Sequence, residues 1–196
     1  MSLVLDPIAQ DLLFREARTA GTFTDEPVTE EQVRAVHDLV KYAPTAYNTN
    51  PLRVTLVRSP GARRRLAALM DEGNRAKTEA APLVAILATD NEFHEELPAL
   101  LPHFPQARET VFAERQVREK TALLSGALQA AYFLLGVRAA GLAAGPMTGF
   151  DHAGLRQEFL DDDHTPLMVV NIGRPGENAW YPRSPRLAYE DVVTTV

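Results

Sequence analysis

Hydrophobic residues recur at helical spacing in several parts of the chain. The clearest case is "PVTEEQVRAVHDLVKYA", where valines and leucines form a stripe after Thr29, a typical helix cap, and Gln32 completes a capping box three positions later. Helices are predicted by the same reasoning in four further places: residues 7–18 with Asp6 as the cap, about 61–73, about 109–140, and a short stretch after Asp151.

Three short runs predict strands. "RVTLVRS" is rich in β-branched residues, whereas "APLVAILATD" and "PLMVVNIG" are continuous apolar runs, typical of strands buried on both faces. Residues 91–110, here called the excursion, are broken by three prolines but are too apolar to be disordered. We interpret the excursion as a functional lid. Together these elements predict one α+β domain over residues 1–196.

Two features predict a second subunit. The helix expected over about 109–140 is apolar and rich in small residues on all sides, so it must be buried on all sides. Three or four short strands also make a small sheet with exposed edges. A partner subunit would cover both features, although packing inside a larger monomeric core would also bury the helix.

Composition and charge narrow the classes of protein. The 196 residues carry a net charge of -6 with a pI near 5.4, which argues against a nucleic-acid partner. Cysteine is absent, which excludes disulfides and thiol nucleophiles and suits a reducing compartment. The N-terminus lacks signal-peptide features, and Ser125, Gln129 and Arg138 interrupt the long apolar stretch, which favours a core helix over a membrane anchor. We therefore expect a cytoplasmic protein without a membrane segment.

Familiar catalytic motifs are absent from the sequence. It has no GxGxxG after a strand, no GxxxxGK[ST], no HExxH and no GxSxG. The five histidines do not have the spacing of metal ligands, and "DDDH" at residues 161–164 is better interpreted as an acidic turn than as a cation site. No metal is predicted.

Polar segments that expose backbone carry the remaining chemistry. "APTAYNTNPLR" (residues 43–53) holds more amide and hydroxyl groups between its two prolines than a surface loop requires. Arg18 and Thr19 could bind a phosphate where the first helix ends. "GNRAK" places Asn74 and Lys77 on one helical face, where they could bind the carbonyls of a heterocycle.

Two further segments could also contact such a ligand. "GPMTGF" has glycines on either side of residues 146–148, which lets a ligand approach backbone N–H groups. Arg183 and Arg186 stand three apart in a proline-rich tail. Each segment also has an ordinary interpretation, as a surface turn or a helix end. Together they would supply the phosphate anchor, heterocycle clamp and backbone donor that a mononucleotide cofactor needs.

On these residues the sequence resembles the nitroreductase-like FMN-dependent oxidoreductases along nearly its whole length. "APTAYNTNPLR" is similar to the family's proline, two small residues, x-Asn-x-Gln-Pro-Trp motif, with Asn50 in place of Gln and Leu52 in place of Trp. "GNRAK" and "GPMTGF" match segments that contact the flavin ring. "LPALLPH" and "GPMTGFD" are most similar to the malonic-semialdehyde reductase branch of pyrimidine degradation. The family's Arg-rich phosphate signature is only partly kept in "ARTAGTF", where Ala17 and Gly21 replace cations.

The resemblance implies a mixed sheet flanked by helices, in an intertwined homodimer whose C-terminal tails cross to the partner. FMN would accept hydride from NADH or NADPH and pass it through N5 to a small acceptor such as malonic semialdehyde, without a dedicated acid–base residue. Lys77 would stabilise the reduced flavin, and an acceptor pocket would include Phe93, His103 and Phe104. The implied FMN contacts are Arg18, Thr19, Pro44, Thr45, Ala46, Asn48, Asn50, Asn74, Lys77, Pro146, Met147, Thr148, Gly149, Arg183 and Arg186.

Three alternatives stay open at this point. A broad-specificity nitro- or quinone reductase would have the same fold and cofactor. A flavin-binding module without turnover would keep the site but not the reaction. A metal-dependent hydrolase would instead use the scattered His and Asp residues.

Overall fold

A four-stranded antiparallel sheet forms the centre of the fold. In a computed structural model, which describes residues 3–196, the strands are β1 (Leu52–Val57), β2 (Leu83–Asp90), β3 (Ala143–Met147) and β4 (His164–Gly173). Their order across the sheet is β1-β2-β4-β3, and every neighbouring pair is antiparallel. The predicted α+β fold with helices flanking the sheet is confirmed, but the sheet is not mixed within residues 3–196, because β2 and β3, which run in the same direction, are separated by the antiparallel strand β4.

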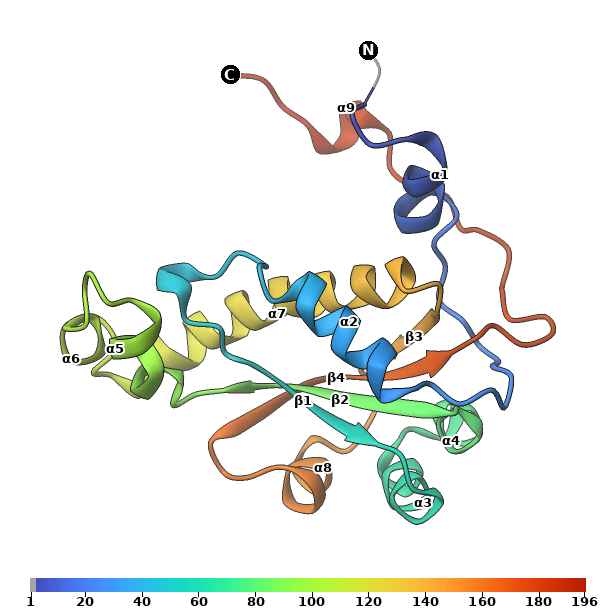
Figure 1. The fold of residues 1–196 in the computed structure, drawn as a ribbon, viewed down its shortest axis with the longest axis horizontal. Coiled ribbons are helices and arrows are strands. Elements are labelled where there is room, and N and C mark those ends of the chain that lie inside the picture. Colours follow the sequence, from blue (N-terminus) through green and yellow to red (C-terminus); the bar gives the residue numbers. More distant parts are fainter. Residues whose placement is uncertain (1–2) are drawn as a thin grey trace.

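Helices cover both faces of the sheet (Figure 1). One face carries α2 (Glu30–Val40) and α7 (Arg115–Ala139); the other carries α3 (Pro60–Leu69), α4 (Glu72–Ala80) and α8 (His152–Phe159). Successive residues of β2 serve the two layers in turn, because side chains alternate along a strand. Leu83, Ala85 and Leu87 pack with α2 and α7, whereas Val84 and Ile86 pack with α3 and α8. The predicted burial of this strand on both faces is confirmed.

Local sequence signals place several helix ends. Thr29 and Gln32 form the predicted capping box of α2, and Asp6 caps α1 (Pro7–Gln10). α1 continues into a single π-helical turn, Asp11–Arg15, so the predicted first helix is shorter than expected. The helix predicted over about 61–73 is two helices, α3 and α4. The chain breaks between them because Met70 leaves the helix and pairs with Phe150 across the face of the sheet.

The excursion folds into three short turns before α7 begins. They are a 3-10 turn (Phe93–Glu96), α5 (Leu97–Leu100) and α6 (Ala107–Thr110). Their apolar side chains form a small core of their own together with Phe112 and Ala122. For this reason α7 begins at Arg115, later than the sequence predicts.

The core helix α7 is buried on one side only. Phe133 and Val137 pack against α2 and the sheet. Its length and composition would also suit a membrane span, but these contacts make it part of the core. Leu123, Leu124 and Leu128 point away from the sheet and are exposed, Leu124 to 66%. Burial on all sides, as predicted, is therefore wrong within one chain, because no described segment covers this face.

The two ends of the described chain lie together, away from both cores (Figure 1). Every residue from Trp180 to Val196 is exposed, including the short helix α9 (Tyr189–Val192). This segment, here called the tail, leads away from the sheet (Figure 1), and Arg183 links it to the N-terminal segment through a hydrogen bond to the Ala17 carbonyl. An exposed tail with few contacts gains little from its own domain, so it is available to another surface.

Candidate functional site

Some predicted ligand residues meet at the outer strand β3. The N-terminal segment that carries Arg18 and Thr19 is held beside β3 by the Ala20 N–H, which donates to the Ala144 carbonyl at 3.0 Å. Gly145 permits this approach, because a Cβ there would stand 2.7 Å from the Ala20 carbonyl oxygen. The tail is linked to this N-terminal segment through Arg183, whose Nη2 donates to the Ala17 carbonyl at 3.3 Å. Within residues 3–196, the hydrogen bonds of the Arg186 side chain go to carbonyls of its own tail, those of Ser184 and Pro185.

The start of α4 joins the same region. Asn74 Nδ2 donates to the Gly149 carbonyl at 3.0 Å, and the Asp71 N–H donates to the same oxygen at 3.0 Å. A Cβ at Gly149 would stand 2.3 Å from Asp71 Oδ2 and 3.1 Å from Asn74 Nδ2, so a larger residue there would displace the side chains at the start of α4. Lys77 lies one turn further along α4, partly buried, and its ammonium makes no hydrogen bond within residues 3–196.

The turn after β3 differs in one respect from its predicted role. The side chain of Met147 is buried in the core below the sheet, with its sulfur 3.9 Å from Thr78 Oγ1. Only the backbone of Met147 is therefore available to a ligand. Thr148 is exposed, and Pro146 has no N–H to donate. The residues named so far are here called the β3 group: Arg18, Thr19, Asn74, Lys77, Pro146–Gly149, Arg183 and Arg186.

A second set, residues 44–50, is here called the α7 group because it lies on that helix. The Ala46 N–H donates to Ser125 Oγ at 3.2 Å, and the Leu52 N–H donates to Gln129 Oε1 at 2.9 Å. Gln129 Nε2 also donates to Asn50 Oδ1 at 3.3 Å. In the sequence, Ser125 and Gln129 are only polar interruptions of an apolar helix. The structure shows that they hold this loop in place.

The amides of the α7 group are largely used by the chain itself. Tyr47, Asn48 and Asn50 all have positive φ, a conformation that asparagine tolerates better than most residues. Asn50 Nδ2 donates to the carbonyl oxygen of Asn48 at 2.7 Å, and Asn48 Nδ2 donates to the Leu100 carbonyl at 2.8 Å. The loop is thereby tied to the excursion. Thr45 and Pro44 contribute a hydroxyl and a fixed backbone at its start, where Thr45 Oγ1 accepts from the Asn50 N–H at 3.4 Å.

Aromatic residues of the loop and the excursion stand together. The Tyr47 ring lies 5.5 Å from the Phe112 ring, edge on, and 6.5 Å from the Phe104 ring. Tyr47 and Phe104 are both exposed, as is His103. Phe93, the third predicted residue of the acceptor pocket, is completely buried in this chain and packs edge on against Phe112 at 5.1 Å. It supports the aromatic pair from below.

The β3 group and the α7 group do not form one site within a chain. In Figure 1 the loop before β1 lies above the sheet, beside the excursion, whereas α4 lies below the sheet at the opposite end. No hydrogen bond joins the two groups within the described chain. A ligand that used both groups would therefore have to touch two chains.

Comparison with known proteins identifies the family. The model of the nitroreductase family matches residues 15–174. The chain belongs to the nitroreductase family. A provisionally named NADH dehydrogenase/NAD(P)H nitroreductase of Streptomyces coelicolor is 76% identical over 196 residues, with 100% of both chains covered. Another, of Streptomyces griseus, is 74% identical over 196 residues, again covering 100% of both.

A solved structure shows the same fold for this nitroreductase-family chain. It is a nitroreductase-like protein of Exiguobacterium sibiricum in complex with FMN, which matches with a TM-score of 0.85 at 18% identity. The match covers 100% of this chain and 99% of that one. As for metals, no three His, Asp or Glu side chains within residues 3–196 are close enough together to hold an ion.

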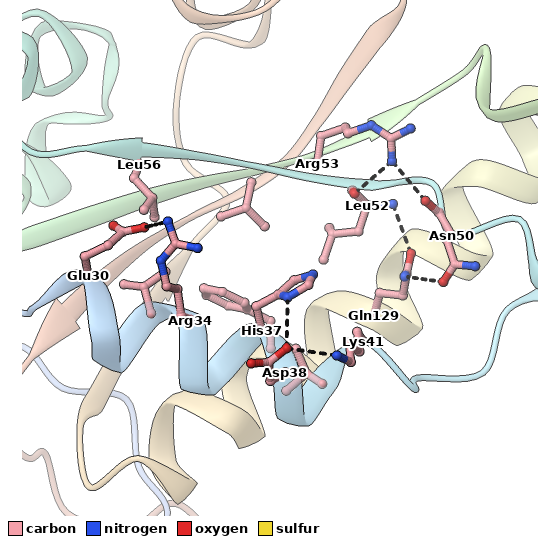
Figure 2. A pocket seen from close by; sticks show the side chains of 14 residues that line it. Glu30, Arg34, His37, Asp38, Lys41, Asn50, Leu52, Arg53, Leu56 and Gln129 are labelled. Carbon is pink, nitrogen blue, oxygen red and sulfur yellow. Dashed lines mark hydrogen bonds and ion pairs between the residues drawn. The ribbon is translucent and has the colours of Figure 1, made fainter. Parts of the chain in front are cut away.

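This nitroreductase-family chain also has a large groove that the sequence did not predict. It measures about 620 Å³ and lies between α2 and β1 (Figure 2). Its floor is apolar, and its rim carries charged side chains that are paired: Arg34 with Glu30, Lys41 with Asp38, and Arg53 with Asp90. β1 is an edge strand, so its outer backbone groups have no partner strand in the described chain. Of the predicted site residues, only Asn50 lines this groove.

Proposed function

We propose that the protein is an FMN-dependent NAD(P)H oxidoreductase that reduces a small aldehyde such as malonic semialdehyde. Three observations support the cofactor: membership of the nitroreductase family, the fold shared with an FMN complex, and the chemistry of the β3 group. That group combines cationic side chains, an amide and a glycine turn within one region. The contact between Asn74 and Gly149 carries most weight, because it joins two predicted ring-binding segments that are 75 positions apart in sequence.

The residues present fit a flavin mononucleotide. Asn74 and Lys77 would hold the pyrimidine edge of the ring, and the turn at Gly149 would let the ring approach backbone N–H groups. The phosphate would be held by the cationic and hydroxyl side chains of Arg18, Thr19, Arg183 and Arg186. Arg18 now pairs with Glu16 at 3.3 Å, and that carboxylate is 66% exposed, so the exchange to a phosphate would cost little.

The cofactor would carry the reaction. Bound FMN supplies a site that accepts hydride from NADH or NADPH and passes it to an acceptor at the same ring face. The protein's own residues would position the ring, exclude water and place positive charge where electrons accumulate. Lys77 is suited to that last role, since its ammonium has no hydrogen-bond partner within residues 3–196.

The arrangement of the two groups supports a homodimer with each ligand between two chains. The exposed leucines of α7 would pack against the same helix of the partner. The tail would cross to the partner, where the α2–β1 groove offers an unpaired strand edge and an apolar floor. We place this dimer in the cytoplasm, where NAD(P)H is supplied.

A broad nitro- or quinone reductase is the second candidate, and one observation favours it. The exposed aromatic pair of Tyr47 and Phe104 offers a flat surface on which a planar acceptor could stack. The semialdehyde proposal rests on sequence resemblance in the excursion and the turn after β3.

A panel of acceptors separates the two candidates. The holoenzyme is given NADH or NADPH and then malonic semialdehyde, a quinone or a nitroaromatic compound. Higher kcat/KM for the semialdehyde supports the first proposal. Turnover of quinones with none of the semialdehyde contradicts it and supports the second. Flavin binding without reduction by either nicotinamide would leave only a binding module.

A further inference from the structure

Tyr47 lies in the middle of the α7 group, in a backbone conformation that tyrosine rarely adopts. Its φ of 52° and ψ of 26° fall in the left-handed region. Asn48 and Asn50 also have positive φ, but asparagine tolerates that conformation, whereas a bulky side chain there is strained. Such strain persists only where the surrounding structure fixes it, and it is concentrated at functional sites.

Hydrogen bonds on both sides of Tyr47 fix this conformation. Before it, the Ala46 N–H donates to Ser125 Oγ of α7 at 3.2 Å. After it, Asn48 Nδ2 donates to the Leu100 carbonyl of the excursion at 2.8 Å. The backbone of Tyr47 is therefore held between the core helix and the excursion.

The ring of Tyr47 rests on buried aromatic residues. Phe93 and Phe112 are 0% and 1% exposed and pack edge on against each other, and Phe112 meets the Tyr47 ring edge on at 5.5 Å. Packing of this kind needs only a phenyl ring. Tyr47 is 48% exposed, and its hydroxyl makes no hydrogen bond within residues 3–196. The ring is thus fixed, while its polar group stays available.

Other polar side chains of the loop are less able to donate to an acceptor. The Asn48 amide is bonded to the excursion, and Asn50 Nδ2 donates to the Asn48 carbonyl at 2.7 Å. The hydroxyl of Thr49 is buried. In the excursion, His103 is exposed beside Phe104 and is a second possible donor.

We propose that the Tyr47 hydroxyl donates a hydrogen bond, and then its proton, to the carbonyl oxygen of the acceptor. The inference rests on the proposed function, in which NAD(P)H supplies the two electrons through FMN. Hydride adds to the carbonyl carbon, the π pair of the C=O bond moves to oxygen, and the Tyr47 proton completes the alcohol. Water then returns a proton to the exposed tyrosinate. The acceptor class is a carbonyl compound, and the reaction gains a proton donor that the sequence resemblance did not imply.

A simpler explanation is that the hydroxyl only contacts water. Tyrosine is favoured where one end of a side chain is packed and the other end is wet, which accounts for an aromatic residue at this position. It does not account for the strained backbone that presents the ring beside residues proposed to bind FMN.

Tyr47→Phe tests the proposal, since it removes the hydroxyl and keeps the ring. The FMN-loaded protein is reduced with NADH or NADPH, and its reoxidation is followed by stopped-flow absorbance. One acceptor is malonic semialdehyde, or a quinone if the wild type does not reduce the semialdehyde; the other is ferricyanide, which takes single electrons and needs no proton. We expect reoxidation by the carbonyl acceptor to be about 100-fold slower, the lower end of the range for general acid catalysis, and reoxidation by ferricyanide to be unchanged. Tyr42→Phe, at a tyrosine that is 79% exposed just after α2, should change neither rate.

Binding gives a second readout that does not depend on turnover. 3-Hydroxypropionate, the alcohol that reduction of malonic semialdehyde yields, is titrated into the oxidised FMN-loaded protein and followed by flavin absorbance. Loss of one hydrogen bond should weaken its binding by about 3- to 10-fold in Tyr47→Phe, with the affinity for FMN unchanged.

His103→Gln distinguishes the two possible donors. Slow carbonyl reduction in His103→Gln, with Tyr47→Phe at the wild-type rate, would overturn the inference. It would also be overturned if Tyr47→Phe matched the wild type in both readouts, or if it slowed ferricyanide as much as the carbonyl acceptor, since that would indicate a general disturbance of the loop. Failure of both nicotinamides to reduce bound FMN in the wild type would instead refute the proposed function.

Discussion

Replacing Arg118 with methionine should release the excursion from the rest of the fold. This arginine, only 9% exposed, joins both ends of that segment. Its Nε donates to the Asn91 carbonyl at 3.1 Å, and its Nη1 donates to the Phe112 and Ala113 carbonyls at 3.1 and 2.8 Å. Its Nη2 pairs with Glu92 Oε1 at 2.9 Å. One side chain therefore fixes the start and the end of the proposed lid.

The expected loss of stability follows from these contacts. Removing one partner of a buried ion pair costs about 3–5 kcal/mol, because the other charge is left unpaired. The Glu92 side chain is 31% exposed and can regain water, which favours the lower end, about 3 kcal/mol. For a protein of this size that corresponds to a fall in Tm of roughly 6–12 °C. The freed carbonyls also lose their donors, so the excursion should exchange its amide hydrogens faster than the sheet does.

Urea unfolding gives the change in free energy, and hydrogen exchange shows where the loss occurs. Arg115→Met is the matched control on the same helix, since Arg115 pairs with Glu119 but is 51% exposed. Exposed ion pairs contribute little to the free energy of unfolding, so this control should have nearly the same free energy of unfolding as the wild type. An Arg118→Met protein within about 1 kcal/mol of the wild type, with unchanged exchange in the excursion, would refute the reasoning.

Three further predictions concern the cofactor and pH. Replacing Arg183 and Arg186 with alanine should weaken FMN binding by roughly 100-fold in a fluorescence titration, because two phosphate contacts are lost; equal affinity would mean that the tail is solvated. Gly149→Ala should weaken FMN binding by about tenfold, since its Cβ would stand 3.1 Å from Asn74 Nδ2 and displace the amide proposed to hold the ring, and unchanged affinity would place the ring elsewhere. The hydrogen bond from His164 lowers the pKa of Asp161, so its stabilisation is present above the ordinary value of 3.8 and is lost as pH falls through the lowered pKa. Asp161→Asn should accordingly flatten the acid limb of the stability profile, and an unaltered limb would contradict this.

The sequence predicted the elements whose signals are local. The capping box of α2 lies within four residues, and the apolar runs of β2 and β4 need no distant information. Strand β3 was missed because "AAGPM" contains glycine and proline, which are depleted in strands. Its place at the sheet edge tolerates Pro146, and the tight approach of Ala20 requires Gly145. Both conditions depend on segments distant in the chain.

The candidate site also separates local from long-range information. Local composition identifies its polar loops, whereas the contacts between those loops cannot be predicted from the sequence. Contact between Asn74 and Gly149, and the support that Ser125 and Gln129 give to the loop, exist only after folding. Phe93 was assigned to the pocket because an aromatic residue in an irregular segment can face either way, and only packing against Phe112 determines that it faces inward.

The central claim is that this chain binds FMN and exchanges hydride between NAD(P)H and the bound flavin. The most direct test is the visible spectrum of the purified protein, reconstituted with FMN under anaerobic conditions and recorded before and after addition of NADH or NADPH. The account predicts a bound flavin spectrum that bleaches with either or both nicotinamides and returns when an acceptor is added. No bound flavin at saturating FMN, or a bound flavin that neither nicotinamide reduces, would contradict it.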